Sequence, residues 1–403
     1  MRRVAIAVFL LAGAAASHVA CGSDDEAAPL SRDGGARDTG SDVSDASDPR
    51  CGTQATFLDT HPHASQQPTP LGKTLSDTRG WKGLLYFGYG DFEANSGPIH
   101  ITTYDPKGRA WQDHAVAYKE SGTGELKTTP AFATHAIERY APIADSLWAT
   151  AAQPSGTPPF DRANAPEYAI ATGGHDWTQV DFAPTTLHIV SAIERAPGDI
   201  YLTGSAVMET DASVNANGRP GGHIWRSVDG GPFVQLFPNF AESSPGSEFF
   251  DLSGGWINGA ALNGVVYMNE SGFIYKHDGT KWDFWEEFGQ YLAPVTFAGH
   301  IVFANMGYFF AFDGTKRKDL DFRFFESQGR YQTRKEPLAL FQVTEGRLLA
   351  VKHGGDVMMT TDLVTWSCIG KAPADATSIG SLDGVVYFGS VNSGVYAFPE
   401  RSW

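Results

Sequence analysis

His135, His188 and Arg139 are the side chains of this sequence best suited to catalysis. A neutral imidazole can act as a general base or bind a divalent metal, and a guanidinium can neutralise the carboxylate or sulfate of an acidic sugar. Because both histidines precede a copy of a recurring turn, described below, we expect them at one edge of the fold. A structural role, with each histidine hydrogen bonded or solvated, is the alternative interpretation.

Arg139 also has an alternative interpretation, in which its role is structural. The stretch Ala136-Ile137-Glu138-Arg139 returns as Ala192-Ile193-Glu194-Arg195. Since buried charges are normally paired, a repeated Glu–Arg pair is also expected where two structural units brace each other. The repeat aligns His135 with Ser191 rather than with His188, which weakens the case for paired catalytic histidines.

Three further residues are candidates for binding a ligand. Asp251 occupies the position of His135 and His188 in the next repeat. Tyr140 adds an aromatic ring beside the candidate arginine. Arg334 lies in a basic stretch that faces either an anionic ligand or solvent.

A glycine-rich loop at residues 88–98 contains three oxygen donors, Asp91, Glu93 and Asn95. Hard cations such as Ca²⁺ take oxygen ligands, so this loop is a candidate calcium site, and a divalent metal such as calcium is the one cofactor the sequence suggests. The spacing lacks the later bidentate carboxylate of an EF-hand loop. A wide structural turn is the alternative interpretation.

Other chemistry finds no support. The sequence contains no phosphate-binding loop, no Gly-x-Ser-x-Gly elbow and no His-Glu-x-x-His zinc helix. A formal net charge of −16 argues against a nucleic-acid partner, because phosphate binding needs clustered Lys and Arg.

The elements that must position these residues are short strands that follow a recurring turn. Its clearest copy is Asp383-Gly384-Val385-Val386-Tyr387-Phe388, and related phrases begin near residues 83, 145, 198, 263, 299 and 346. Successive copies lie roughly 35 to 65 residues apart, a period typical of a propeller array. The chain also has 45 glycines and lacks long stretches with the apolar periodicity of a helix, which agrees with many short strands joined by turns. We therefore predict an all-β chain with a single β-propeller of about seven four-stranded blades.

Two details of this prediction concern particular segments. Residues 110–118 are expected to form one strand, the last of the first blade. The seventh blade lacks an outer strand at its carboxyl-terminal end, so residues 54–75 are expected to supply it and close the ring.

A second recurring phrase occupies the predicted turns between third and fourth strands. Ser227-Val228-Asp229-Gly230-Gly231 resembles the Asp-box, or BNR repeat, of sialidase-type propellers, and residues 277–282, 312–315 and 361–366 resemble it more loosely. The resemblance covers about residues 75–403 and implies a propeller in which these boxes are structural. The arginine triad and tyrosine nucleophile of true sialidases are not carried over, because their Arg-Ile-Pro signature is not found.

The amino terminus has the pattern of an export signal. Residues 1–20 combine Arg2 and Arg3 with a short apolar stretch. The phrase Val19-Ala20-Cys21-Gly22 resembles a bacterial lipobox, which implies lipidation at Cys21, although an Ala-x-Ala site at residues 14–16 would instead release a secreted protein. Residues 21–50 are expected to be a disordered acidic linker, and residues 51–403 the propeller domain.

Two cysteines remain, Cys51 and Cys368. In an exported protein two such cysteines are expected to pair. A disulfide between them would fix the start of the fold to its last blades.

These patterns predict a glycan- or protein-binding module at the bacterial cell envelope, held to the membrane through the lipid anchor only. The partner would be a glycan or an envelope protein, and one fold hosts many such functions. The alternative is an extracellular polysaccharide-degrading enzyme, a glycoside hydrolase or lyase with its site at the propeller mouth. A third possibility, an assembly scaffold, predicts a large exposed apolar patch.

Overall fold

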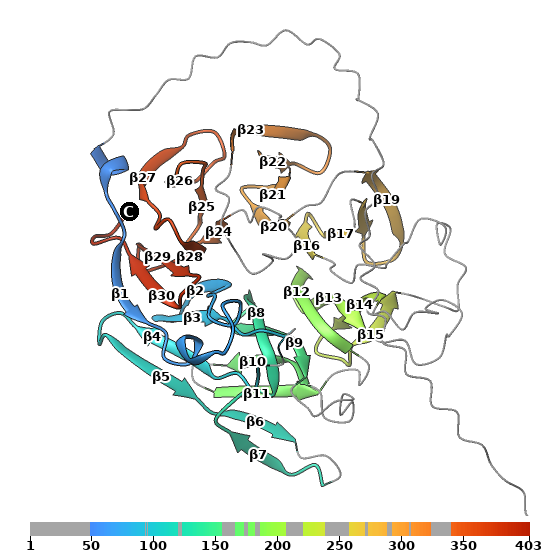
Figure 1. Ribbon diagram of the computed structural model, residues 1–403. Helices are drawn as coiled ribbons and strands as arrows, with labels where there is room; N and C mark the ends of the chain where they lie inside the picture. Colours follow the sequence, from blue (N-terminus) through green and yellow to red (C-terminus); the bar gives the residue numbers. More distant parts are fainter. Residues whose placement is uncertain are drawn as a thin grey trace, which may run out of the picture. The chain divides into compact units, whose positions relative to one another are not determined.

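The computed structural model shows a seven-bladed β-propeller (Figure 1), as the sequence predicts. The strands of each blade pair antiparallel, and the first strands of neighbouring blades contact one another around the centre of the ring. The structure describes residues 49–92, 94, 96–119, 123–154, 166–172, 176–181, 186–206, 221–237, 258–270, 273–287, 292–305, 308–323 and 340–403. Among these residues, no helix is long and apolar enough to cross a membrane.

The strands follow one another along the chain within blades 1 to 6. Blade 1 comprises β2 (Asp77–Trp81), β3 (Leu84–Gly88), β4 (Ile101–Asp105) and β5 (Ala110–His114). Blade 2 comprises β8 (Thr134–Ile143), β9 (Ser146–Pro154), β10 (Pro166–Thr172) and β11 (Asp176–Asp181). Blade 3 comprises β12 (Thr186–Ala196), β13 (Asp199–Ala206), β14 (Gly221–Val228) and β15 (Val234–Phe237). Blade 4 comprises β16 (Asn258–Leu262), β17 (Val265–Glu270), β18 (Phe273–His277) and β19 (Trp282–Glu287).

The remaining blades follow the same order until the last strand. Blade 5 comprises β20 (Leu292–Phe297), β21 (His300–Asn305), β22 (Tyr308–Phe312) and β23 (Arg317–Arg323). Blade 6 comprises β24 (Phe341–Thr344), β25 (Arg347–Val351), β26 (Asp356–Thr360) and β27 (Ser367–Lys371). Blade 7 comprises β28 (Ala376–Leu382), β29 (Val385–Ser390), β30 (Gly394–Ala397) and β1 (Thr56–Thr60).

The ring closes by strand exchange, as the sequence predicts. β1 pairs antiparallel with β30, with Thr56 opposite Ala397 and Thr60 opposite Gly394, so the blue strand lies beside the red one in Figure 1. Just before β1, in the 3₁₀ helix η1 (Pro49–Gly52), Cys51 forms a disulfide with Cys368 of β27, and their Cα atoms are 5.3 Å apart. The amino-terminal segment is therefore joined to both blade 6 and blade 7.

The recurring turn links the first strand of a blade to the second. Asp383 and Gly384 have φ values of 52° and 80°, and Asn263 and Gly264 have 52° and 76°. Two successive residues with positive φ define the two-residue hairpin whose twist matches that of the strands it joins, and Asn, Asp and Gly tolerate this conformation. This requirement explains why the phrase recurs.

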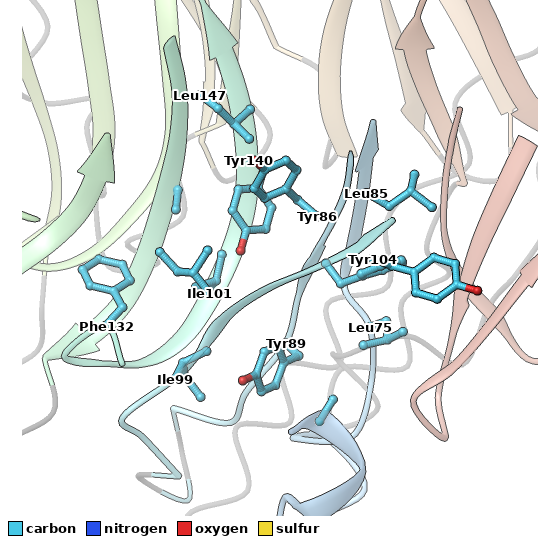
Figure 2. Packing of buried hydrophobic residues seen from close by; sticks show 14 of the residues in the cluster. Leu75, Leu85, Tyr86, Tyr89, Ile99, Ile101, Tyr104, Phe132, Tyr140 and Leu147 are labelled. Carbon is cyan, nitrogen blue, oxygen red and sulfur yellow. The ribbon is translucent and has the colours of Figure 1, made fainter. Parts of the chain in front are cut away.

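The core lies between blades, where side chains of neighbouring sheets interdigitate. The ring of Tyr86 of β3 lies 5.4 Å from that of Tyr140 of β8, centre to centre (Figure 2). The ring of Trp177 of β11 lies 6.0 Å from each of them. At the centre of the ring there is no room for side chains between some inner strands. A Cβ on Gly80 of β2 would lie 1.9 Å from the carbonyl oxygen of Ser381 of β28.

The expectation of one strand over residues 110–118 is wrong. β5 ends at His114, and the chain continues as β6 (Val116–Lys119), which pairs parallel with β11 of blade 2. β6 then forms a hairpin with β7 (Leu126–Thr129), which extends blade 2 outward. The alternation of buried and exposed residues runs on through His114 and Val116, and such alternation identifies a strand but not its partner.

A histidine and aspartate cluster as the candidate functional site

Two histidines and an aspartate converge on blade 1. His63 lies on the segment between β1 and β2, His100 directly precedes β4, and Asp113 belongs to β5. Ligand atoms of the three side chains all lie within 4.8 Å of one another, and they form a group of the kind that can hold a metal ion. The cluster therefore joins the segment that closes the ring to the outer half of the first blade.

The geometry of the cluster is compact. The rings of His63 and His100 stack with centres 3.9 Å apart and 1° between their planes. Nε2 of His63 lies 3.0 Å and 2.9 Å from the two carboxylate oxygens of Asp113, and Nδ1 of His100 lies 3.9 Å from Oδ2 of the same carboxylate. One carboxylate thus faces one nitrogen of each imidazole.

Buried neighbours hold the two histidines in place. His61, which is fully buried, accepts a hydrogen bond at Nδ1 from the backbone N–H of Ala64, and this bond shapes the turn that carries His63 into the short helix η2 (Ala64–Gln66). The hydroxyl of Tyr89 lies 3.1 Å from both the carbonyl oxygen and the amide nitrogen of His100. The backbone that carries both imidazoles is therefore held by the fold before any ligand arrives.

The carboxylate is held as well. Oγ1 of Thr102 donates a hydrogen bond of 2.7 Å to Oδ1 of Asp113. Burial alone would raise the pKa of Asp113, but the hydrogen bonds from Thr102 and His63 and the two nearby imidazoles hold that pKa below its ordinary value. Asp113 is thus an anion at neutral pH.

Electrostatics differ among the three histidines of this region. Burial lowers the pKa of His100, and the neighbouring His63 lowers it further, against the opposing effect of Asp113. Burial lowers the pKa of His61 to about 3, so this ring is neutral and serves as a packing element against Tyr89 and Trp111. The cluster itself stays accessible, because the side chains of His63, His100 and Asp113 are 25%, 30% and 47% exposed.

His135 and His188 lie on adjacent inner strands, β8 and β12, and both are buried. The loop of blade 1 that joins β3 to β4 reaches both of them. The backbone N–H of Gly97 donates to Nδ1 of His135 at 2.9 Å, and the ring of Phe92 lies edge-on to His188 with centres 4.9 Å apart. Burial lowers the pKa of His135. Both imidazoles therefore have contacts within the fold.

Arg139 and Tyr140 lie further along β8. Residues four apart in a strand are separated by about 13 Å, so Arg139 lies well away from His135. Its amide N–H donates to Oγ1 of Thr150 at 3.1 Å. Tyr140 is 1% exposed, its ring packs in the core between blades, and burial raises its pKa well above the ordinary value. The structure thus brings the two predicted histidines onto neighbouring strands but does not bring Arg139 to them.

The predicted calcium loop is described in part. Asp91 is 4% exposed; its Oδ2 accepts a hydrogen bond of 2.6 Å from Thr69 and its Oδ1 one of 3.0 Å from the N–H of Ala94. The bond from Thr69 joins the loop to the segment before β2, and the bond from Ala94 lies within the loop. The other predicted ligands and sites that lie outside the described residues are Glu93, Asn95, Asp251, Arg334 and Cys21.

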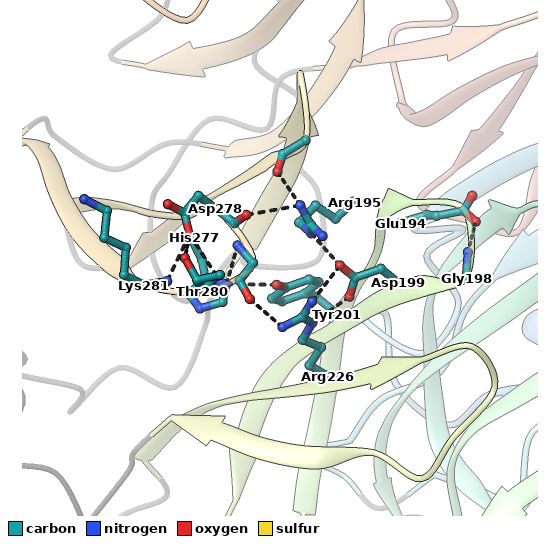
Figure 3. A network of polar contacts seen from close by, with 12 residues as sticks. Glu194, Arg195, Gly198, Asp199, Tyr201, Arg226, His277, Asp278, Thr280 and Lys281 are labelled. Atoms are coloured by element: carbon teal, nitrogen blue, oxygen red, sulfur yellow. Dashed lines mark hydrogen bonds and ion pairs between the residues drawn. The ribbon is translucent and has the colours of Figure 1, made fainter.

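The repeated Glu–Arg phrase has a bracing role at its second copy. Arg195 and Arg226 both bind the carboxylate of Asp199 within blade 3 (Figure 3), and Arg226 does so at 2.7 Å and 3.0 Å. The same guanidinium groups reach blade 4, where Arg195 donates to the carbonyl oxygen of Gly264 at 2.8 Å and Arg226 to that of Gly279 at 2.7 Å. The partner of Arg195 is therefore Asp199 rather than Glu194, which accepts the N–H of Gly198.

The four Asp-box-like phrases all lie at turns between the third and fourth strands of their blades. Oδ1 of Asp278 accepts hydrogen bonds from the N–H groups of Thr280 and Lys281 at 2.8 Å and 2.9 Å. Asp313 and Asp362 cap their own turns in the same way. These aspartates stabilise the turns, in agreement with a structural role.

Sequence reasoning did not find the cluster of His63, His100 and Asp113. The three residues lie far apart along the chain and in no common motif. The close spacing of His61 and His63 was the available signal, and it was weak, because a chain with twelve histidines readily contains such a pair by chance. It became informative only once the fold placed the closing segment over blade 1.

Comparison with known proteins finds similar solved structures but no related sequence. No protein-family model and no curated protein sequence matches the chain. The extracellular domain of BT4673 from B. thetaiotaomicron is similar with a TM-score of 0.50 and 11% identity, over 87% of this chain and 43% of that one. The WD40 β-propeller domain of Doa1 is similar with a TM-score of 0.49 and 10% identity, over 87% and 98% of the two chains.

A third solved structure is PorZ, a bacterial surface component of the type-IX secretion system of Porphyromonas gingivalis. It has a TM-score of 0.46 and 11% identity, over 85% of this chain and 37% of that one. This chain thus spans less than half the length of PorZ and of BT4673. At such identities a likeness says nothing beyond the fold, and the β-propeller is established by the strand order of this chain itself.

Proposed function

We propose that this chain is an exported β-propeller that acts as a binding module at the cell envelope and holds a glycan or another envelope protein. Residues 1–20 serve as its signal peptide, Cys21 carries the lipid, residues 21–50 form the tether, and residues 51–403 form the binding domain. The Asp-box-like turns support the proposal that this propeller is of the BNR type. The disulfide between Cys51 and Cys368 supports export, since such bonds persist in oxidising compartments.

One observation carries the choice of binding over catalysis. The loop between β3 and β4 reaches across to both histidines predicted for catalysis, His135 and His188, and each is less than 10% exposed. A general base must come within hydrogen-bond reach of its substrate. The β3–β4 loop contacts both imidazole rings, so a substrate outside the fold does not reach them. Accessible polar side chains of the same region include Gln66 and those of the His63 cluster.

The binding surface we propose is the loop face, formed by residues 61–76 and by residues 89–92, 94 and 96–100. These two segments lie at the same end of blade 1, and the amide of Gly90 donates to the carbonyl oxygen of Gly72. The turn at residues 105–110 lies at the opposite end of that blade, because β4 runs from one end to the other. A rigid ring that presents fixed loops suits recognition with little loss of conformational entropy.

The test measures binding and turnover on one sample. The purified protein is applied to a glycan array and crosslinked to envelope extracts, and it is incubated with neutral and acidic polysaccharides while new reducing ends and unsaturated-uronate absorbance are followed. We expect a captured glycan or protein whose binding weakens on Gln66→Ala at the loop face. Lys281→Ala, at an exposed third-to-fourth-strand turn, is the matched control and should bind normally.

Turnover that disappears in His135→Ala and His188→Ala would reject the binding module in favour of the polysaccharide-degrading enzyme. The anchor is tested separately. Cells that carry the wild-type chain or Cys21→Ala are labelled with a radioactive fatty acid, and only the wild type should incorporate the label and sediment with membranes. Incorporation by both would exclude Cys21 as the lipidated residue.

A further inference from the structure

We propose that His63, His100 and Asp113 bind one divalent transition-metal ion, of which Zn²⁺ is the representative. This site is distinct from the calcium loop suggested by the sequence, and it needs neither the envelope partner nor the lipid anchor. Among the described residues, these three are the group of histidines, cysteines and acidic residues close enough to share an ion.

The distances between ligand atoms fit a small ion. Ligand atoms about 2.0–2.1 Å from a tetrahedral zinc ion lie about 3.4 Å from one another. In the structure, Nε2 of His63 lies 2.9 Å from Oδ2 of Asp113, and Nδ1 of His100 lies 3.9 Å from the same oxygen. The two values bracket the ideal spacing, so shifts of about half an ångström would complete the coordination.

The donor set selects the class of metal. Neutral imidazole nitrogens are ligands for Zn²⁺, Cu²⁺, Ni²⁺ and Fe²⁺, whereas Ca²⁺ and Mg²⁺ prefer oxygen. Nδ1 of His100 is buried and makes no hydrogen bond in the described part of the chain. It faces the carboxylate of Asp113, with 3.9 Å between Nδ1 and Oδ2.

The surroundings are those of a supported metal site. Thr102 is 1% exposed, and its hydroxyl orients the carboxylate of Asp113; hydrogen bonds of this kind to a ligand tune metal affinity. The backbone of His100 is fixed by Tyr89, and the turn of His63 by His61. The three protein ligands leave a fourth position toward solvent, since Asp113 is nearly half exposed.

Such an ion would also join parts of the ring. His63 belongs to the segment that follows β1, the closing strand of blade 7, whereas His100 and Asp113 belong to blade 1. Bound metal would therefore cross-link the closing segment to the first blade, and it would stabilise the folded ring by mass action.

Isothermal titration of Zn²⁺ into the untagged, EDTA-treated, dialysed full-length protein tests the site directly. We expect one Zn²⁺ per chain and a loss of affinity of at least tenfold in His63→Ala, His100→Ala and Asp113→Asn. The matched control is His353→Ala, which removes an exposed histidine in the turn after β25 and should leave the affinity unchanged. Absence of binding by the wild type, or unchanged affinity in all three ligand variants, would overturn the proposal.

Two measurements separate a metal site from a structural cluster. Co²⁺ should give the intense visible spectrum of a low-symmetry, four-coordinate ion in the wild type, and His63→Ala should lose it while its far-UV circular dichroism stays native. Thr102→Val should weaken Zn²⁺ binding about tenfold. A Co²⁺ spectrum that persists in His63→Ala, or that is typical of the free hexaaqua ion in the wild type, would contradict the assignment.

Thermal unfolding supplies the readout for cross-linking. Zn²⁺ should raise the Tm of the wild type and of His353→Ala and leave that of His100→Ala unchanged. An equal shift in all three proteins would place the ion elsewhere. Failure of the envelope-binding test would leave these outcomes unaffected, so the two proposals can fail independently.

Discussion

Tyr201 of blade 3 and His277 of blade 4 form a buried hydrogen bond between blades, with the tyrosine hydroxyl 2.8 Å from Nδ1 of the imidazole. The backbone N–H of Gly279 also points at this nitrogen, at 3.3 Å. Because Nδ1 accepts from an amide, the proton of the neutral ring lies on Nε2. The hydroxyl of Tyr140, by contrast, is buried without a hydrogen-bond partner in the described part of the chain.

The two tyrosines therefore predict opposite responses to the loss of a hydroxyl. Tyr201→Phe should lower the free energy of unfolding by about 1 kcal/mol, because it removes the shorter of the two hydrogen bonds to a buried nitrogen and leaves only the bond from Gly279. Tyr140→Phe should leave that free energy unchanged within about 0.5 kcal/mol or raise it slightly, because it removes a buried hydroxyl without a partner. Urea unfolding measures both. A larger loss in Tyr140→Phe would show that its hydroxyl has a role in the folded state.

His277 predicts a pH dependence of stability. Burial, followed by the charge of Arg226, lowers its pKa from 6.5 to about 4. The unfolded chain thus binds a proton more readily than the folded one, so stability is full above pH 6.5 and falls as the pH drops from 6.5 to about 4. Arg195, Asp199 and Asp278 also act on this ring, with Asp199 and Asp278 opposing the shift.

The measurement compares the wild type with His277→Asn, which keeps an acceptor near the Nδ1 position. The difference in unfolding free energy between the two proteins should shrink as the pH falls through this window. A difference that is constant from pH 7.5 to 4.5 would mean that His277 does not titrate as described. The comparison of two proteins removes the contribution of carboxylates common to both.

Asp199 is expected to be a large contributor to stability. Two guanidinium groups, of Arg195 and Arg226, bind its carboxylate, and the side chain is only 6% exposed. Asp199→Asn should destabilise the protein by about 3 kcal/mol, because it leaves two half-buried cations uncompensated between blades 3 and 4. Lys107→Ala is the control: it breaks an ion pair with Asp383 in which Lys107 is 79% exposed, and it should cost less than about 0.5 kcal/mol.

The disulfide predicts sensitivity to reductant. Cys51 and Cys368 are separated by 317 residues, and removing a native cross-link typically lowers stability by about 2–5 kcal/mol. The double variant Cys51→Ser/Cys368→Ser should match the reduced wild type in thermal unfolding and should not respond to reductant itself. Identical unfolding of the oxidised and reduced wild type would show that the bond does not contribute.

The repetitive part of the fold was predictable because its signal is local. A hairpin with two positive φ values demands Asp, Asn or Gly at fixed positions, as at Asp383-Gly384 and Asn263-Gly264, so counting these turns counts the blades. The closing strand was predictable too, since a propeller whose last blade lacks an outer strand must obtain it elsewhere. Residues 56–60 supply it within the expected segment.

There is a physical reason why the cluster of His63, His100 and Asp113 could not be predicted from the sequence. The partner of a strand, and the path of a loop over a neighbouring blade, depend on contacts between distant residues that alternation does not encode. Val116 continues the pattern of β5 yet pairs with blade 2. Likewise, a loop of blade 1 contacts both predicted histidines, through Gly97 at His135 and Phe92 at His188. His63 meets His100 because the segment that carries His63 closes the ring and then crosses to blade 1.

The pairing of Thr56 with Ala397 sets an order of events in time. These residues lie 341 positions apart, and contacts of such separation form late because the entropy of closing the loop must be overcome first. The individual blades are built from neighbouring hairpins and can form early. The first strand of the ring must therefore wait, solvated, until the last hairpin has folded, and the lifetime of that interval decides how long an unpaired edge is open to aggregation.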